Sequence, residues 1–339
     1  MRILSGIQPS GTLHLGNYFG ATAQHVDLQN ATARPEQVFY FIANLHTLTT
    51  VHDAARLRQL TEDVAVDYMA LGLDPAKATF FRQSDVPEVC ELTWFLGCCV
   101  GKGLLERAHS YKDKMARGID PSMGLFNYPV LMAADILVYK STIVPVGKDQ
   151  QQHVEMAQDM AASFNAAFGR QVLARPEWRF SEAPVVPGLD GAKMSKSYDN
   201  TIPIFLPDDM TDQQAYKTYF ASIKTDSRGI DEAKDPNDTL ITLYRLLDPK
   251  GAAEFEPIYL RGGVGYGEVK KRLHEAYSVK FGPLRERRKS IAAGRTYVEG
   301  VLCEGAKRAR AVAREVMAEV REAAGISVAA STHAPLPSR

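Results

Sequence analysis

The feature that most constrains this chain is an alternation of short apolar runs with helix-period stretches through its first two hundred residues. The expected strands are residues 3–7, 37–45, 78–83 and 142–147. The expected helices begin near Asn17 and cover residues 53–72, 88–100, 127–139 and 150–168. Near-continuous apolar strands separated by helices are typical of a parallel sheet that is buried on both faces. The pattern therefore predicts an α/β fold.

Ligands of such sheets bind beyond the carboxyl ends of the strands, so we expect sites just after Ile7, Leu45 and Val146. From about residue 211 the strand pattern disappears, and the expected helices are residues 211–224, 236–247, 267–292 and 295–324. The small, polar residues that follow are expected to form a frayed tail.

The formal net charge is zero, because 40 Lys and Arg residues balance 40 Asp and Glu residues. This balance excludes a protein that coats DNA and a polyacidic chain. The charge is nevertheless uneven, since residues 261–322 hold 15 Lys and Arg residues against 8 Asp and Glu residues. Such a surplus favours a polyanionic partner, although a solvated helical surface explains it equally.

Neither a membrane-spanning apolar run nor the apolar core of a signal peptide is found in the sequence. The four cysteines form neither a disulfide framework nor a metal-binding motif, and we expect buried, reduced thiols. These observations predict a cytoplasmic protein with no membrane partner and no protein-bound metal.

A glycine-rich turn, GIQPSGTLHLGN, follows the first expected strand and opens a helix at residues 6–17. Glycine lets the backbone approach a ligand closely, and a helix N-terminus presents N–H groups to an anion. His14 and Asn17 lie three residues apart and can hydrogen-bond the same group. The turn is compatible with a nucleotide site, but a turn of this kind can also be merely structural.

A second motif, KMSKS, occupies residues 193–197. Two lysines and two serines on a loop suit a departing pyrophosphate, because phosphoryl-type transfer depends on positioning and positive charge. A short basic match is, by itself, equally typical of a surface loop.

Together, the HLGN turn and the KMSKS loop resemble the ATP-binding motifs of class I aminoacyl-tRNA synthetases. SGIQPSG, YPVLMAADIL, VPVGKDQQQH and KMSKS follow one another as in bacterial-type tryptophanyl-tRNA synthetases, and the resemblance covers residues 3–325. It implies a Rossmann-like doubly wound catalytic domain at 1–205, an all-α anticodon-recognising domain at 206–325 and a flexible tail at 326–339. The last helices can pack back on the catalytic domain.

The resemblance also implies a function and partners. The function is that of a tryptophan–tRNA ligase, which forms tryptophanyl-adenylate and pyrophosphate from tryptophan and ATP and then transfers tryptophan to the 3′ end of tRNA(Trp). The partners are tRNA(Trp), tryptophan, ATP and a second copy of the chain, but not DNA. Candidate tRNA contacts in the basic segment are Lys270, Lys271, Arg272, Arg285, Arg287 and Arg288.

The nucleotide site implied by the resemblance draws on the glycine-rich turn, the segment after Val146 and the KMSKS loop. The expected catalytic residues are Gln8, His14, Asn17, Lys193, Ser195 and Lys196. The expected ATP contacts are Gln8, Pro9, Ser10, Gly16, Asn17, Gly147, Lys148, Asp149, Val186, Lys193, Met194, Ser195, Lys196 and Ser197. Mg²⁺ is expected to travel on the ATP phosphates, since the sequence shows no acidic metal cage.

The helix at 127–139 is expected to select the amino-acid substrate, because Tyr128, Met132 and Asp135 share one of its faces. An indole N–H is only a donor, so a carboxylate acceptor suits it, although Asp135 can also be a structural cap. The resemblance implies that the tryptophan-binding residues are Asp135, Tyr128, Met132, Gln150, His46 and Leu4. A lone histidine such as His46 can equally be a satisfied polar residue.

Several positions depart from the family. Leu4 stands where phenylalanine is more frequent, which removes a possible stacking partner for indole, and Lys148 stands where an acidic residue is common. Asn44 and Leu45 replace an Asp-Gln pair. The alternatives are a tyrosyl-tRNA synthetase, a non-catalytic paralogue that binds tryptophan or RNA, and a small-molecule adenylyltransferase.

Overall fold

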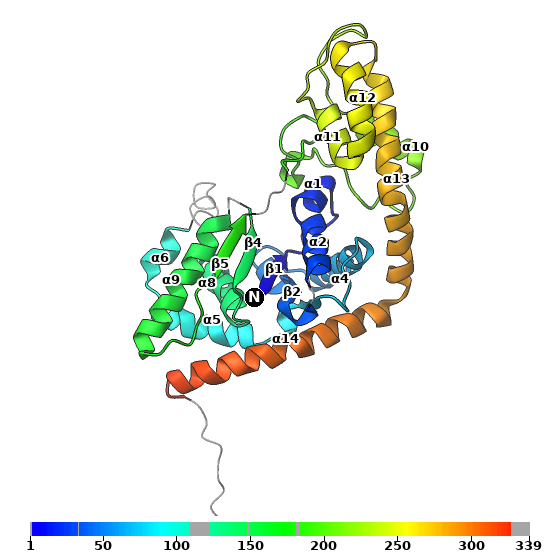
Figure 1. The fold of residues 1–339 in the computed structure, drawn as a ribbon. Coiled ribbons are helices and arrows are strands. Elements are labelled where there is room, and N and C mark those ends of the chain that lie inside the picture. Colours follow the sequence, from blue (N-terminus) through cyan, green and yellow to red (C-terminus); the bar gives the residue numbers. More distant parts are fainter. Residues whose placement is uncertain (1, 33, 109–121, 148–149, 181–183, 327–339) are drawn as a thin grey trace, which may run out of the picture.

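A parallel five-stranded sheet forms the centre of the protein (Figure 1). The computed structural model describes residues 2–32, 34–108, 122–147, 150–180 and 184–326. The strands are β1 (Ile3–Ile7), β2 (Val38–Ile42), β3 (Thr79–Arg82), β4 (Ile143–Val146) and β5 (Glu177–Phe180). They lie in the order β3-β2-β1-β4-β5, and every pair is parallel. The expected Rossmann-like doubly wound sheet is confirmed.

The sheet differs from the prediction in two places. The sequence does not predict β5, whose four residues, EWRF, alternate polar and aromatic side chains at the edge of the sheet. The strand β2 ends earlier than expected, because the residues after it form the short helix α3 (Asn44–Thr47). The chain therefore turns at the carboxyl end of β2, where the alternation places a ligand site.

Helices cover both faces of the sheet. They are α1 (Leu15–Asn17), α2 (Ala23–Ala31), α4 (Ala54–Ala70), α5 (Glu88–Cys99), α6 (Lys102–Glu106), α8 (Met123–Leu137) and α9 (Gln151–Phe168). Successive side chains of a strand point to opposite faces, so Tyr40 joins a core with α4, whereas Phe39 and Phe41 join a second core with α5, α8 and α9. Helix α8 begins before the expected residue 127, because the Ser122 hydroxyl accepts a hydrogen bond from the Leu125 N–H and caps it.

The remaining helices form a second region, part of which projects from the sheet (Figure 1). They are α10 (Asp212–Ala215), α11 (Thr239–Leu247), α12 (Pro249–Arg261), α13 (Tyr266–Ala293) and α14 (Arg295–Ala323). The sequence does not predict α12, whose segment contains Pro249, Pro257 and several polar residues. Among the described residues, no helix is both long and apolar enough to cross a membrane.

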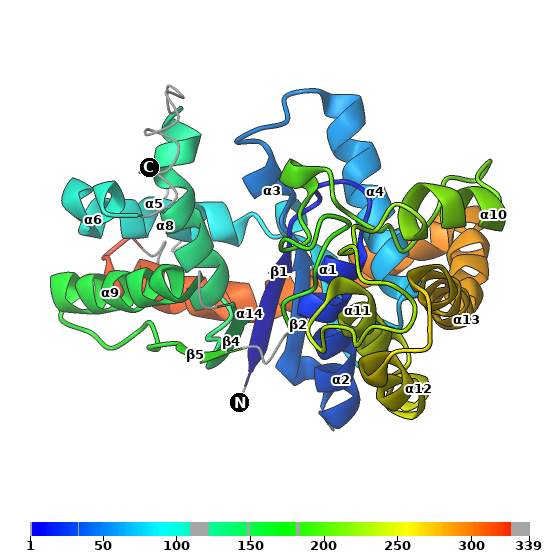
Figure 2. The ribbon, with the colours of Figure 1, turned by 90° about the horizontal axis from the view of Figure 1, so that it is seen from above.

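Helix α14 returns from this region and passes along the sheet beside α5 (Figures 1 and 2). Its closest approach is at Gly305, where an added Cβ would lie 1.8 Å from the Phe80 carbonyl oxygen of β3. The helix backbone therefore rests directly on the strand backbone. Residues that follow this contact along α14, such as Ala309 and Ala313, are small and fully buried in the core shared with α5 and α8.

Ion pairs join α13 and α14 to the helices α4 and α5 that cover the sheet. Arg310 and Arg314 donate to Glu88 at 3.0 and 3.2 Å, and Arg321 pairs with Glu91. Burial raises the pKa of Glu88, but hydrogen bonds from Arg310 and Arg314 outweigh it and leave the pKa below its ordinary value.

The basic surplus of residues 261–322 is thus partly internal. On α13, Arg288 donates to the buried Asp67 at 2.5 Å, and Arg285 donates to the Ile204 carbonyl at 3.0 Å. These two guanidinium groups hold α13 against its neighbours, so their charge is at least partly used within the chain, and their expected contact with tRNA stays a prediction.

The close contact at Gly305 predicts a large cost for Gly305→Ala. The added methyl group cannot be accommodated without separating α14 from β3, so the free energy of unfolding should fall by at least about 2 kcal/mol. Gly300→Ala is the matched control, because nothing lies within 4 Å of its added Cβ and alanine favours a helix by up to about 1 kcal/mol. Urea unfolding of both variants measures the difference, and equal stabilities would contradict the contact.

Candidate active site

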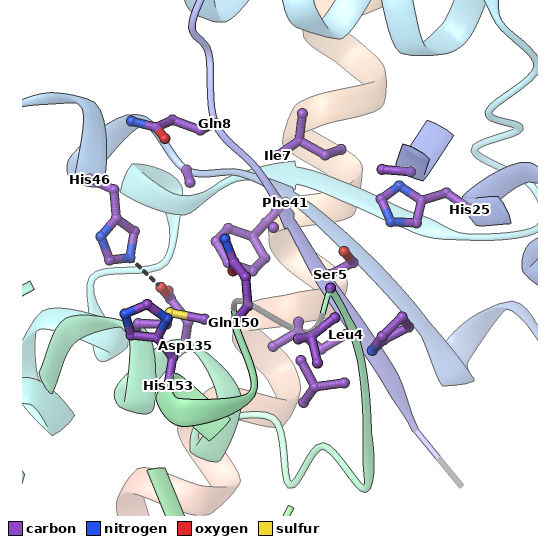
Figure 3. A pocket seen from close by; sticks show the side chains of 18 of the residues that line it. Leu4, Ser5, Ile7, Gln8, His25, Phe41, His46, Asp135, Gln150 and His153 are labelled. Atoms are coloured by element: carbon purple, nitrogen blue, oxygen red, sulfur yellow. Dashed lines mark hydrogen bonds and ion pairs between the residues drawn. The ribbon is translucent and has the colours of Figure 1, made fainter. Parts of the chain in front are cut away.

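A cavity of about 690 Å³ opens at the carboxyl ends of β1, β2 and β4. The strand β1 lies between β2 and β4, and the chain reaches those two neighbours through helices on opposite faces of the sheet. This is the switch point of a doubly wound sheet, where the connections diverge and leave a crevice. Figure 3 shows side chains from both faces of β1 converging on it.

Asp135 lies on the α8 side of the cavity and is almost completely buried. Its Oδ2 is 3.0 Å from His46 Nε2, as the dashed line in Figure 3 marks. Gln83 Nε2 donates to both carboxylate oxygens, at 2.9 and 2.8 Å. The orientation of this amide is fixed, because Gln83 Oε1 accepts the Leu45 N–H at 3.0 Å.

The partners of Asp135 favour the ionised form of its carboxyl group, which is a hydrogen-bond acceptor only. Burial raises the pKa of Asp135 above its ordinary value, while hydrogen bonds from His46 and Gln83 act in the opposite direction. A carboxylate has about four acceptor positions, so capacity remains for a donor that enters the cavity. The arrangement suits a ligand with a single N–H or O–H on an apolar body.

The six residues expected to bind tryptophan all line this cavity. They are Leu4, His46, Tyr128, Met132, Asp135 and Gln150. Tyr128 is held from α9, since its hydroxyl lies 2.7 Å from His153 Nε2.

Sequence reasoning missed Gln83 and Phe41. Gln83 directly follows the carboxyl end of β3, so its position in the alternation was a usable signal. Phe41 lies inside an apolar strand, where nothing in the sequence distinguishes a cavity wall from core.

The KMSKS loop packs against the glycine-rich turn. Lys196 Nζ donates to the Ser10 carbonyl oxygen at 3.0 Å, and the Gly16 N–H points to Met194 Sδ at 3.3 Å. The segment after the loop pairs with the turn, since the Leu15 N–H donates to the Ile202 carbonyl at 3.0 Å. Two motifs far apart in the sequence therefore meet at one side of the cavity.

A buried asparagine, which the sequence did not indicate, holds the loop together. Asn200 Oδ1 accepts the Ser195 N–H at 2.8 Å, and its Nδ2 donates to Asp190 Oδ1 at 2.7 Å. An added Cβ at Gly188 would lie 2.3 Å from Asn200 Nδ2, so glycine is required at this position, five residues before the KMSKS motif.

The expected ATP and catalytic residues fall into three groups. Those that line the cavity are Gln8, Ser10, Asn17 and Gly147. Those that lie outside its lining are Pro9, His14, Gly16, Val186, Lys193, Met194, Ser195, Lys196 and Ser197. Lys148 and Asp149 lie outside the described residues.

His14 is buried beneath the loop, and its backbone N–H donates to Asn17 Oδ1 at 3.1 Å. Burial, followed by the charge of Lys196, lowers the pKa of His14 to about 4. The imidazole is therefore neutral at physiological pH. Among the described residues, no group of three or more His, Cys, Asp or Glu side chains could hold a metal ion.

Comparison with known proteins agrees with these motifs. The model of the family described as tRNA synthetases class I (W and Y) matches residues 1–281. The chain belongs to this family. A tryptophan–tRNA ligase of Rhodopirellula baltica is 48% identical over 330 residues, which cover 96% of this chain and 100% of the relative.

Two further relatives agree with this assignment. A tryptophan–tRNA ligase of Fusobacterium nucleatum is 46% identical over 96% of this chain and 98% of its own length. A crystal structure of tryptophanyl-tRNA synthetase from Campylobacter jejuni, complexed with ADP and tryptophan, matches with a TM-score of 0.87 and 45% identity. That match covers 96% of this chain and all of the other. The structural match therefore extends over nearly the whole chain.

The contact between the two synthetase motifs predicts the titration of His14. Its ring should titrate near pH 4, below the ordinary 6.5, as followed by NMR of the labelled imidazole. Lys196→Gln removes a positive charge and should raise this pKa, while burial, the larger cause, still keeps it below 6.5. Lys193→Gln is the matched control and should leave it unchanged. Titration of wild-type His14 near 6.5 would show that the loop does not cover the turn in solution.

Proposed function

We propose that the chain is a tryptophan–tRNA ligase, which activates tryptophan with ATP and transfers it to the 3′ end of tRNA(Trp). The observation that carries this proposal is the buried acceptor Asp135 in a cavity of mixed polar and apolar lining next to the KMSKS loop. An indole N–H can donate to the acceptor position that His46 and Gln83 leave open on this carboxylate, whereas phenylalanine has no donor for it. The identities of 46–48% with tryptophan–tRNA ligases support the same substrate.

In the first step, the tryptophan carboxylate attacks the α-phosphorus of ATP and pyrophosphate leaves. The carboxylate is already ionised at neutral pH, so no general base is needed. The step instead requires in-line placement and neutralisation of the departing charge. Lys193 and Lys196 would supply positive charge, and Ser195 and Ser197 would donate hydrogen bonds.

The glycine-rich turn would hold the nucleotide. Gln8, Ser10 and Asn17 line the cavity on this side, and Gly147 lies opposite them on the segment after β4. His14, being neutral, would support the turn or donate one hydrogen bond without adding charge. We assign Mg²⁺ to the ATP phosphates, since this ion usually binds through substrate phosphates and few protein oxygens.

The second step is attack of a terminal ribose hydroxyl of tRNA(Trp) on the activated carbonyl. We assign tRNA binding to the helical region of residues 206–325, after its internal ion pairs are set aside. Arg261, Lys271 and Arg287 are exposed, and no described residue pairs with their charged groups. They are the candidate phosphate contacts, and their replacement should reduce the salt dependence of tRNA binding.

A homodimer is also proposed, through the outer face of α5. Cys90, Trp94 and Cys98 follow one another at intervals of four residues and are all exposed. The expectation of buried cysteines is therefore wrong for Cys90 and Cys98, because this side of α5 faces away from the core, and it is also wrong for the exposed Cys303 on α14. Trp94 is 75% exposed, which is unusual for tryptophan unless another surface covers it. We place the protein in the cytoplasm because its four cysteines are free.

Amino-acid-dependent ATP–pyrophosphate exchange tests the first step. Tryptophan should support exchange far better than tyrosine or phenylalanine. Asp135→Asn should lower kcat/KM for tryptophan about 10- to 100-fold, because it replaces a charged hydrogen-bond acceptor. Asp159→Asn, which changes an exposed carboxylate on α9, is the control and should have no effect. Dominance of tyrosine would favour the tyrosyl enzyme, and binding of tryptophan without exchange would favour a non-catalytic paralogue.

Sedimentation analysis tests the dimer. Trp94→Glu should weaken the dimer at least about tenfold, since a buried interfacial tryptophan is often a hot spot. Val279→Glu changes a side chain that is equally exposed, at 77%, but lies on α13. It should leave the dimer intact, and equal behaviour of the two variants would exclude α5 as the interface.

A further inference from the structure

The ring of Phe41 forms part of the cavity wall, although no motif assigns it a role. Phe41 lies on β2 next to β1, lines the cavity and is 5% exposed. Figure 3 shows its ring on the same side of β1 as Asp135 and Gln150. An aromatic side chain therefore lies near the residue that would accept the ligand's N–H.

The position of this ring is imposed by its neighbours. Gly6 pairs with Phe41 in the sheet, and a Cβ added to Gly6 would lie 2.6 Å from Phe41 Cζ. The ring cannot retreat, because Phe81 stacks behind it with centroids 6.1 Å apart and planes at 29°. Phe81 is itself fully buried and contacts Tyr139 edge to face. Glycine is thus needed at position 6, because a larger residue would overlap the Phe41 ring.

The large β1 side chain on this side of the cavity, Leu4, is not aromatic, and this makes the Phe41 ring important for contacts with an aromatic ligand. Leu4 lies on the same face of β1 as Gly6, lines the same cavity and is buried, but it offers no aromatic surface. Among the described strand residues that line the cavity, only Phe41 on β2 carries an aromatic ring.

We propose that Phe41 is a specificity-determining residue that provides an aromatic contact from the sheet for the indole ring of tryptophan. The proposal rests on the proposed function. Asp135 fixes the N–H end of the indole, and Phe41 contacts its ring, so the two together define its orientation. Aromatic pairs prefer offset-stacked or edge-to-face contacts and gain more than the buried area alone provides.

Steady-state exchange kinetics of Phe41→Leu test this role. The KM for tryptophan should rise about three- to tenfold, the range expected for loss of one aromatic contact, while the KM for ATP stays unchanged. Phe39→Leu is the matched control, because Phe39 lies on the same face of β2 and is buried but does not line the cavity. It should leave the KM for tryptophan unchanged. If Phe41→Leu fails to fold, Phe41→Met removes the ring with less loss of volume and should give the same increase.

Gly6→Ala provides an independent arm. Its methyl group would displace the Phe41 ring, so the KM for tryptophan should rise in the otherwise wild-type chain. In a Phe41→Leu background the same change should add little, because the ring is gone. An unchanged KM in Phe41→Leu, or effects of the two substitutions that simply multiply, would overturn the proposal. Absence of tryptophan-dependent exchange in the wild-type chain would instead refute the proposed function.

Discussion

The position of the site depends on how the chain reaches the two neighbours of β1, because the connections to them run on opposite faces of the sheet. One connection leads to β2 on the face of α2 and α4, and the other side of β1 is occupied by β4, which the chain reaches through α5 and α8. Backbone hydrogen bonds hold these strands in parallel register, so their carboxyl ends meet at one edge. The cavity, the Asp135 network and the glycine-rich turn all occupy the opening that this divergence leaves.

The sequence predicts those parts of the fold and site that depend on local pattern. The period of apolar residues predicts four strands and the long helices of the catalytic region. Strand ends and a family resemblance predict the six cavity residues around Asp135. Gln83 and Asn200 could not be assigned in this way, because their roles depend on partners far away in the sequence, at Asp135 and in the loop at residues 188–195. The edge strand β5 and the helix α12 have segments too short or too polar to show a period.

The charge distribution shows how composition can mislead. The basic surplus of the C-terminal helices suggests a nucleic-acid surface. However, Arg288 forms an ion pair with Asp67, and Arg310 and Arg314 form ion pairs with Glu88. Acidic residues of the catalytic region and basic residues of the last helices therefore balance each other across an internal contact. A zero net charge conceals this complementarity, because a count of charges carries no information about their partners.

The position of α14 has a consequence for how the chain folds during its synthesis. The face of β3 that α14 covers is formed by residues 79–82, but its cover is synthesised much later, as residues 295–323. Until residues 295–323 have emerged, Phe81 and its apolar neighbours lack one of their packing surfaces. The nucleotide-binding region therefore cannot complete its core as an independent early domain, even though domains generally fold in the order of their synthesis. Docking of α14 is thus the event that closes this core.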